Sequence, residues 1–277
     1  MATTKIFSDS LKEEKIVLPK AFQRGYSMSY STNVPRQLGL AGSSAICTAA
    51  FRALMDWHGV SEKQIPPERL AGYVLRAEQQ ELGIAAGLQD RVAQAYDQPV
   101  FMDFTPEAFA MHDGKFGSYE VLDAAVIEFF KGRLFLLFPV TPPHVEEEGK
   151  SSGKVHSPVR KLWEQGDPVV RQTMVEIGGL AVLGKKAVEE KDANTFVDLM
   201  NRNFALRLKL FGAAVAERDR KVIDVAKSFG PGIGAKLPGS GGAVLAFAVQ
   251  GKDFAEFMAK QKDVTAVELE LRHPSRL

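Results

Sequence analysis

Residues 33–57 read NVPRQLGLAGSSAICTAAFRALMDW, and this stretch decides the fold that the sequence predicts. An extended run leads into a loop that contains Gly39 and Gly42. Two serines then open a helix that is apolar nearly all round, runs to about residue 57 and stops at Gly59. A helix of this composition is expected to be buried in the core.

Elementary chemistry allows this loop to bind an anion. Glycines let a backbone approach an anion closely, and the first turn of a helix offers unpaired N–H groups at a positive dipole end. Ser43 or Ser44 can cap the helix, and a hydroxyl there could reach a metal held by phosphates. The simpler interpretation is an ordinary capped helix, because the loop matches neither the Rossmann nor the Walker pattern.

The motif Pro35-x-x-x-Gly39-x-x-Gly42-Ser43-Ser44-Ala45 resembles the phosphate-binding loop of the superfamily that contains galactokinase, homoserine kinase, mevalonate kinase and phosphomevalonate kinase. That loop usually reads Pro-x-Gly-x-Gly-x-Gly-Ser-Ser-Ala. Gln37 replaces its first glycine, Ala41 is an extra residue, and the resulting variant is similar to the form in glucuronokinases, which are sugar-acid 1-kinases. The nucleotide-binding residues that this resemblance implies are Pro35, Leu38, Gly39, Leu40, Ala41, Gly42, Ser43, Ser44 and Ala45.

A second informative stretch, residues 77–96, reads AEQQELGIAAGLQDRVAQAY. Its two glycines break one helix, and a new helix is expected to begin near residues 88–90. An acidic residue at a helix start is usually only a cap. Galactokinase-like sequences, however, carry a magnesium-binding Glu and a catalytic Asp twelve residues apart, as Glu78 and Asp90 are here. The resemblance therefore implies that Glu78 and Ser44 hold Mg²⁺ and that Asp90 lies beside the sugar hydroxyl.

The third stretch, residues 232–245, reads GIGAKLPGSGGAVL. Alone, it predicts a tight turn before a buried strand over residues 243–249. It also resembles the C-terminal glycine motif of the superfamily, Lys-x-Thr-Gly-x-Gly-Gly-Gly, although Pro238 stands at the usual threonine and Ala243 at the last glycine. The resemblance implies nucleotide contacts from Gly239, Ser240 and Gly241, with the ATP phosphates between this loop and the first one.

A sugar acid is an anion, so a cationic side chain should meet its carboxylate, preferably an arginine in bidentate geometry. The candidates are Arg91, Lys154 and Arg160, and the sequence does not rank them. The segments 152–157 and 201–207 also resemble glucuronokinases. Without that resemblance, the apolar residues of 201–207 are expected in the core and its arginines on the surface.

The chain has 277 residues, enough for one large domain or two modest ones. Lys plus Arg number 35 and Asp plus Glu 34, which argues against a broad nucleic-acid surface or an electrostatic membrane anchor. No apolar run is long enough to span a membrane, and the N-terminus has no apolar signal core. The single cysteine, Cys47, indicates a buried thiol and a cytosolic setting. Oligomeric state is not predicted.

The fold class that follows is α+β, with the two lobes of the superfamily kinases. Residues 1–140 are expected to form an N-terminal lobe like domain 2 of ribosomal protein S5, and residues 141–277 a ferredoxin-like C-terminal lobe. No strong element is expected before Lys20. The remaining expectations are strands at 26–31, 99–104, 133–138 and 265–271, helices starting at 66–67 and covering 167–190, 193–211, 213–228 and 253–260, a loop with a short helix at 105–132, and a linker or functional loop at 141–160.

Superfamily members begin with a strand and loop that bind the sugar, and residues 1–24 contain no counterpart. We therefore expect the N-terminal lobe to lack its first strands, with an exposed sheet edge, weak ATP–Mg²⁺ binding and little turnover by this chain. The implied reaction is ATP plus D-glucuronate giving 1-phospho-D-glucuronate and ADP. The alternatives are a nucleotide-binding relative or partner subunit without turnover, and a kinase for another sugar such as galacturonate or galactose.

Overall fold

The computed structural model describes residues 1–20, 25–35, 38–140, 152–212, 215–239 and 241–271, with the backbone alone at 152–157. Contacts divide the chain into two compact units. Unit 1 comprises Met1–Val34 and Ala41–Leu122, and unit 2 comprises Pro35–Leu40 and Asp123–Leu277. The lobe boundary predicted after residue 140 stays a prediction, and the compact units divide eighteen residues earlier, after Leu122.

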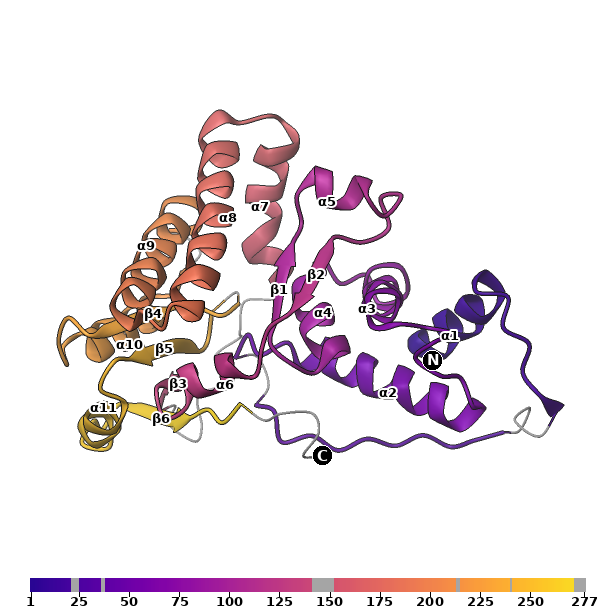
Figure 1. The fold of residues 1–277 in the computed structure, drawn as a ribbon, viewed down its shortest axis with the longest axis horizontal. Helices are drawn as coiled ribbons and strands as arrows, with labels where there is room; N and C mark the ends of the chain where they lie inside the picture. The colour runs from indigo at the N-terminus through magenta and orange to yellow at the C-terminus, as the bar shows by residue number, and fades with distance from the viewer. Residues whose placement is uncertain (21–24, 36–37, 141–151, 213–214, 240, 272–277) are drawn as a thin grey trace. The chain divides into compact units, whose positions relative to one another are not determined.

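Unit 1 consists mainly of helices with one short antiparallel strand pair, β1 with β2, in which Val100 lies opposite Val121 (Figure 1). Its elements are α1 (Ala2–Glu13), α2 (Gly42–His58), α3 (Pro67–Arg76), the π-helical turn η2 (Ala77–Glu81), α4 (Gln89–Tyr96), β1 (Val100–Asp103), α5 (Pro106–Ala110) and β2 (Ser118–Val121). The helix starts predicted at Pro67 and near residues 88–90 are confirmed, as is the strand expected at 99–104.

Two expectations for the N-terminal part are wrong. Residues 2–13 form a helix because Thr3, Ile6, Phe7 and Ser10 recur at helical spacing and bury one face. Residues 26–31, expected to be a strand, are exposed and lack regular structure, and they pair with no strand among the described residues. A strand without a partner leaves its backbone groups to water, so the alternating pattern alone does not make one.

The helix α2 buries one face rather than its whole circumference. The buried side chains of this helix are Ser44, Cys47, Thr48, Phe51, Leu54 and Met55. Phe51 is fully buried, and it packs edge-on against Phe7 and stacks on Tyr73. These contacts tie α1, α2 and α3 into one core, centred nine residues after α2 begins.

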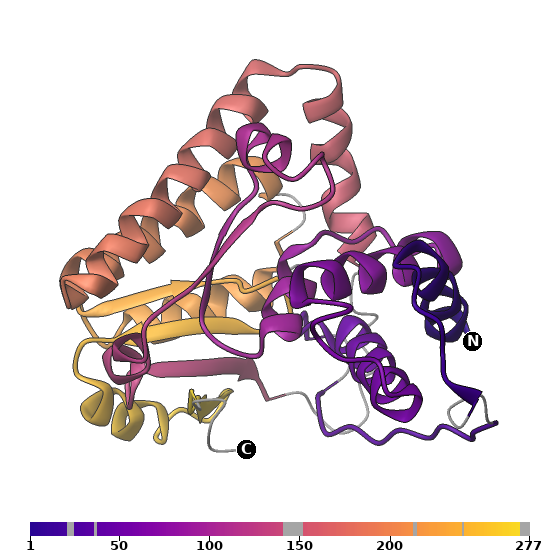
Figure 2. The ribbon, with the colours of Figure 1, turned by 45° about the vertical axis from the view of Figure 1, so that its right-hand side comes forward.

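Unit 2 contains a four-stranded antiparallel sheet in the order β4-β5-β3-β6 (Figure 2). Its elements are α6 (Ala125–Phe130), β3 (Leu134–Pro139), α7 (Ser152–Glu164), α8 (Pro168–Glu189), α9 (Ala193–Phe211), α10 (Glu217–Lys227), β4 (Ile233–Lys236), β5 (Val244–Ala248), α11 (Gly251–Met258) and β6 (Val264–Glu268). Helices separate β3 from β4 and β5 from β6, and the strand order is 2-3-1-4 counted within the unit. This is the ferredoxin-like arrangement predicted for the C-terminal lobe.

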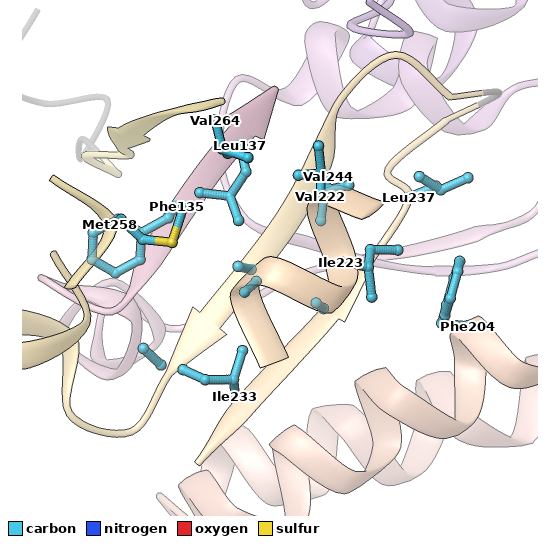
Figure 3. Packing of buried hydrophobic residues seen from close by; sticks show 14 of the residues in the cluster. Phe135, Leu137, Phe204, Val222, Ile223, Ile233, Leu237, Val244, Met258 and Val264 are labelled. Atoms are coloured by element: carbon cyan, nitrogen blue, oxygen red, sulfur yellow. The ribbon is translucent and has the colours of Figure 1, made fainter. Parts of the chain in front are cut away.

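The core of unit 2 lies between the sheet and the helices that cover it. Phe135 and Leu137 on β3, Val244 on β5 and Val222 and Ile223 on α10 are all almost completely buried (Figure 3). Burying such side chains is worth about 1.5–3 kcal/mol each. The strands that flank the second glycine loop are therefore anchored by the main core of the unit.

Two further expectations for the middle of the chain are corrected. The region 105–132 contains the strand β2 and two short helices rather than one. The linker expected at 141–160 is in part the helix α7, which contains Pro158, while 141–151 lie outside the described residues. The helix α7 was not predicted because Gly153 and Pro158 lie within it, and both residue types disfavour helix interiors. No helix among the described residues is both long and apolar enough to cross a membrane.

Candidate active site

The first glycine loop is divided between the units, with residues 35–40 in unit 2 and residues from 41 onward in unit 1. In unit 2, Gly39 has φ +66° and a side chain on it would come within 2.5 Å of the Gly241 carbonyl oxygen. A side chain on Gly239 would likewise come within 2.7 Å of the Gly39 carbonyl oxygen. The two predicted glycine motifs therefore meet backbone to backbone, where no Cβ fits.

In unit 1, the start of α2 differs in detail from the prediction. Neither serine caps the helix, because the N-cap is Ala41, a non-glycine residue in the left-handed region at φ 54°. The Ser44 hydroxyl is fully buried, donates to the Ala41 carbonyl at 2.9 Å and accepts from Gln94 Nε2 at 3.0 Å. Gln94 also donates to the Ala41 carbonyl at 3.2 Å, so α4 fixes the turn from which α2 begins.

Glu78 lies on the π-helical turn η2, and its side chain is fully buried. Arg91 binds one of its oxygens twice, with Nη2 at 2.5 Å and Nε at 2.7 Å from Oε2. The other oxygen, Oε1, has no hydrogen-bond partner among the described residues. A buried carboxylate oxygen without a partner is costly, and single π turns are frequent at functional sites.

Asp90 is the second residue of α4, and its side chain is about half exposed, at 48%. Its Oδ2 lies 3.2 Å from Arg91 Nη1, which also donates to the Gly87 carbonyl at 3.0 Å. Arg91 therefore bridges the buried Glu78 and the accessible Asp90. The structure thus brings together the two acidic residues that were selected for their spacing of twelve.

The three cations suggested for the substrate carboxylate have different surroundings. Arg91 is already bonded to Glu78, and the exposed Arg160 on α7 pairs with Glu164 at 3.1 Å. The side chain of Lys154 lies outside the described residues, as does Ser240 of the second glycine loop. The carboxylate role of all three cations stays a prediction.

The second glycine loop follows β4 and is held by side chains that sequence reasoning did not select. Asp219, in the first turn of α10, accepts from the Gly242 amide at 3.0 Å. Arg207, near the end of α9, donates from Nη2 to the Gly239 carbonyl at 2.7 Å. The expectation that arginines of 201–207 lie on the surface holds for Arg202 and is wrong for Arg207, whose Nε is buried without a hydrogen-bond partner among the described residues.

Burial changes the acid–base properties of two side chains beside this loop. Desolvation lowers the pKa of Lys236, the last residue of β4, to about 8, and the positive charge of Arg207 adds to that lowering. Desolvation also lowers the pKa of the Arg207 guanidinium below its usual value. In unit 1, burial raises the pKa of the Cys47 thiol, which confirms the buried cysteine expected from its apolar helix.

Known proteins match the chain at both ends and over most of its length. The family description "GHMP kinases N terminal domain" matches residues 7–98, and "GHMP kinases C terminal" matches residues 185–271. Glucuronokinase 1 of Arabidopsis thaliana is 39% identical over 267 residues, which cover 94% of this chain and 67% of that protein. The chain belongs to the GHMP kinases. This family consists of phosphotransferases that act on hydroxyl groups.

A second curated relative supports this assignment, and a solved structure supports the fold of this GHMP kinase. Probable glucuronokinase 2 of Arabidopsis thaliana is 38% identical over 263 residues, which cover 94% of the chain and 66% of that protein. The chain thus spans about two thirds of the length of the curated relatives that it matches. The Lactococcus lactis galactokinase structure aligns with a TM-score of 0.65 over 97% of this chain and 74% of that one, at 14% identity, which supports the shared fold.

Magnesium accompanies ATP in GHMP kinases generally, and the residues of this chain fit it. Glu78 Oε1 is an oxygen without a partner of the kind that Mg²⁺ prefers, and the Ser44 hydroxyl retains one lone pair. No cluster of three or more His, Cys, Asp or Glu side chains exists in the part of the chain that the structure describes. Mg²⁺ usually binds through one or two protein groups plus substrate phosphates and water, so Glu78 and Ser44 are sufficient protein ligands.

Sequence reasoning missed Gln94, Asp219, Arg207 and Lys236. Gln94 and Asp219 carried no signal, because the groups that they bind lie more than twenty residues away in the chain. Lys236 belongs to the glycine motif but was not singled out, since a lysine at a strand end is normally exposed. Arg207 carried a weak signal, because it closes the family-like segment 201–207.

Proposed function

We propose that this GHMP kinase transfers the γ-phosphoryl group of ATP to the anomeric hydroxyl of D-glucuronate, giving 1-phospho-D-glucuronate and ADP. The observation that carries the proposal is the 39% identity with Glucuronokinase 1 across 94% of the chain. The glycine contacts, Glu78 and Asp90 support it, since they supply the groups that phosphoryl transfer needs. That reaction requires positioning and charge neutralisation more than covalent chemistry from the protein.

The proposal assigns the phosphates of ATP to backbone N–H groups. Residues 38–44 carry the first glycine loop and the start of α2, whose unpaired amides and dipole favour an anion. Gly239 and Gly241 lie against this loop through Gly39 and leave the backbone accessible where side chains would block it. Asp219 and Arg207 act as positioning residues, because each holds the second loop through one backbone hydrogen bond.

The proposal assigns the acceptor hydroxyl to Asp90. Its carboxylate accepts the proton of the anomeric hydroxyl as the sugar oxygen bonds to the γ-phosphorus and the bond to the ADP oxygen breaks. Partial exposure suits this role, since a substrate must reach the group. Glu78, with Ser44, would hold Mg²⁺, which when bound neutralises charge on the phosphate oxygens. Arg91 orients Glu78 by binding its other oxygen.

A coupled ADP-release assay tests this function with the purified 277-residue protein. The expected result is slow ADP release, in keeping with the little turnover expected of this chain, that requires a sugar and is faster with D-glucuronate than with D-galacturonate or D-galactose. Preference for either of the other sugars would reassign the substrate. ATP binding without sugar-dependent ADP release would support a nucleotide-binding protein without turnover. The proposed function includes a cytoplasmic location for the protein.

A further inference from the structure

Unit 2 places two half-buried cations close to the second glycine loop. Arg207 comes from α9 and Lys236 from the end of β4, and their charges repel each other. Among the described residues, the Arg207 Nε has no hydrogen-bond partner and Lys236 forms no ion pair. Burying an unpaired charge is expensive, so two like charges together indicate a missing anion.

The two cations are held in place by an unusually close contact between α9 and β4. A side chain on Gly234 of β4 would come within 3.0 Å of Met200 on α9. The Asn201 side chain donates to the Ile233 carbonyl at 2.9 Å and accepts from the Ala235 amide at 3.3 Å, so it occupies the open edge of β4. This arrangement places Arg207, almost two turns after Asn201, near Lys236, the residue after Ala235.

The Arg207 side chain is also fixed in orientation. Its guanidinium lies over the Phe211 ring at 5.7 Å, and one Nη2 hydrogen bond reaches the Gly239 carbonyl. The remaining N–H groups of the fork include the buried Nε. Asp219, the carboxylate that contacts this loop, accepts from the Gly242 amide and pairs with Arg218 at 3.6 Å. It therefore serves the loop backbone and does not neutralise the two cations.

We propose that Arg207 and Lys236 together bind one oxyanion of the reactants. A guanidinium fork beside an ammonium group fits a carboxylate or a phosphoryl group, since both offer several oxygens to charged donors. The cost of partly removing these cations from water is then recovered when the anion binds, as is usual at preorganised binding sites.

Two sources of this oxyanion share the same chemistry. One is the carboxylate of the sugar acid, and this source rests on the function proposed above. The other is a phosphoryl group of the nucleotide or product. The carboxylate is favoured. Of the cations first suggested for it, Arg91 already binds Glu78 and Arg160 already binds Glu164. Arg207 and Lys236, in contrast, have no carboxylate partner among the described residues.

Calorimetric titration of the whole protein with four probes separates these sources: D-glucuronate, its neutral analogue D-glucose, ADP and inorganic phosphate. Arg207→Met and Lys236→Met should each weaken binding of one oxyanion probe about 10–100-fold, the size of a lost hydrogen bond to a charged group. Matched controls are Arg202→Met and Lys209→Met, which remove exposed cations from the same helix α9. D-glucose binding should change in none of the variants.

Loss of D-glucuronate affinity alone supports the carboxylate source, and loss of ADP or phosphate affinity alone supports the phosphoryl source. Unchanged affinity for all probes in both variants, or a wild type that binds no oxyanion probe, would overturn the proposal. Lys236→Met carries the test if Arg207→Met fails to fold, because removing a desolvated charge should not destabilise the protein. ADP release measured in parallel separates the proposed kinase function from the oxyanion site. If the wild type does not phosphorylate D-glucuronate, the proposed function is wrong. If it still binds inorganic phosphate through Arg207 and Lys236, the oxyanion site stands.

Discussion

Each compact unit contains a pair of ionisable side chains removed wholly or partly from water, and the two pairs differ in the sign of their charges. In unit 1, Glu78 and Arg91 are opposite charges that bind each other in two hydrogen bonds. In unit 2, Arg207 and Lys236 are like charges, and the charge of Arg207 helps to lower the pKa of Lys236. A pair of opposite charges that bind each other, here called the satisfied pair, mainly fixes structure, although Glu78 Oε1 remains without a partner among the described residues. A pair of like charges, here called the unsatisfied pair, sets the site up for a ligand. Variants of each pair should therefore fail in different ways.

The largest effect is expected from Asp90, the accessible carboxylate next to the satisfied pair of unit 1. Asp90→Asn should lower turnover about 10²–10⁴-fold, because the proposed proton acceptor is lost while the nucleotide contacts remain. The measurements are the coupled ADP-release assay and an ATP titration, in which affinity should be nearly unchanged. Asp97→Asn, an exposed residue at the end of the same helix, is the control. Equal turnover in both variants would show that Asp90 only opens the helix.

Breaking the satisfied pair should cost stability rather than ligand affinity alone. Arg91→Met leaves the fully buried Glu78 carboxylate without its partner, which typically costs about 3–5 kcal/mol of unfolding free energy. Urea unfolding measures this loss. The double variant Glu78→Gln with Arg91→Met should recover much of it, because no charge is then left buried. A loss below about 1 kcal/mol in the single variant would mean that water already reaches Glu78.

The effect of the backbone contact between Gly39 and Gly241 can be separated from left-handed backbone strain by comparing two glycines with nearly the same φ. Gly39 has φ +66° and lies against Gly241, while Gly83 of unit 1 has φ +64° and no atom near its missing side chain. Gly83→Ala should cost about 1–2 kcal/mol for the left-handed backbone. Gly39→Ala should cost about 2–4 kcal/mol, because overlap with the Gly241 carbonyl is added. Equal losses in urea unfolding would show that the two loops separate without cost.

The smallest effect is a gain in stability from the unsatisfied pair. The pKa of Lys236 is about 8 in the folded chain and 10.5 ordinarily, so the unfolded chain keeps this proton to higher pH. The cost of burying the charge is thus fully present below pH 8 and disappears as pH rises to 10.5. Lys236→Met should raise stability at pH 7 by about 1–3 kcal/mol. The difference in unfolding free energy between this variant and the wild type should disappear across this pH range in urea unfolding. A difference that persists at pH 11 would refute the charge explanation.

Sequence reasoning was most successful where a single local pattern determines the structure. The end of α2 at Gly59, the starts of α3 and α4, and the strand β3 follow from glycine, proline and apolar spacing close in the chain. Glu78 and Asp90 were selected only because a known family carries two acidic residues at the same spacing. The family, its fold and its phosphotransferase class were confirmed, whereas the residue roles stay predictions.

What sequence reasoning missed depends on contacts between distant residues. The π-helical turn that holds Glu78 leaves no mark in local composition, since one extra residue in a turn has no preferred sequence. Arg207 and Lys236 looked like ordinary surface cations until α9 and β4 were placed together at Gly234. The strand expected at 26–31 failed for the same reason, because strands exist only through partners that local sequence does not specify.

Cys47 is the single cysteine of the chain, and it is buried on α2 in unit 1 with a raised thiol pKa. A thiol-reactive dye can therefore modify the folded protein only after that helix has opened. The modification rate then reports the local opening of unit 1, while unit 2 has no thiol to contribute. Modification of this single site can therefore show whether unit 1, which contains Glu78 and Arg91, opens before global unfolding or together with it.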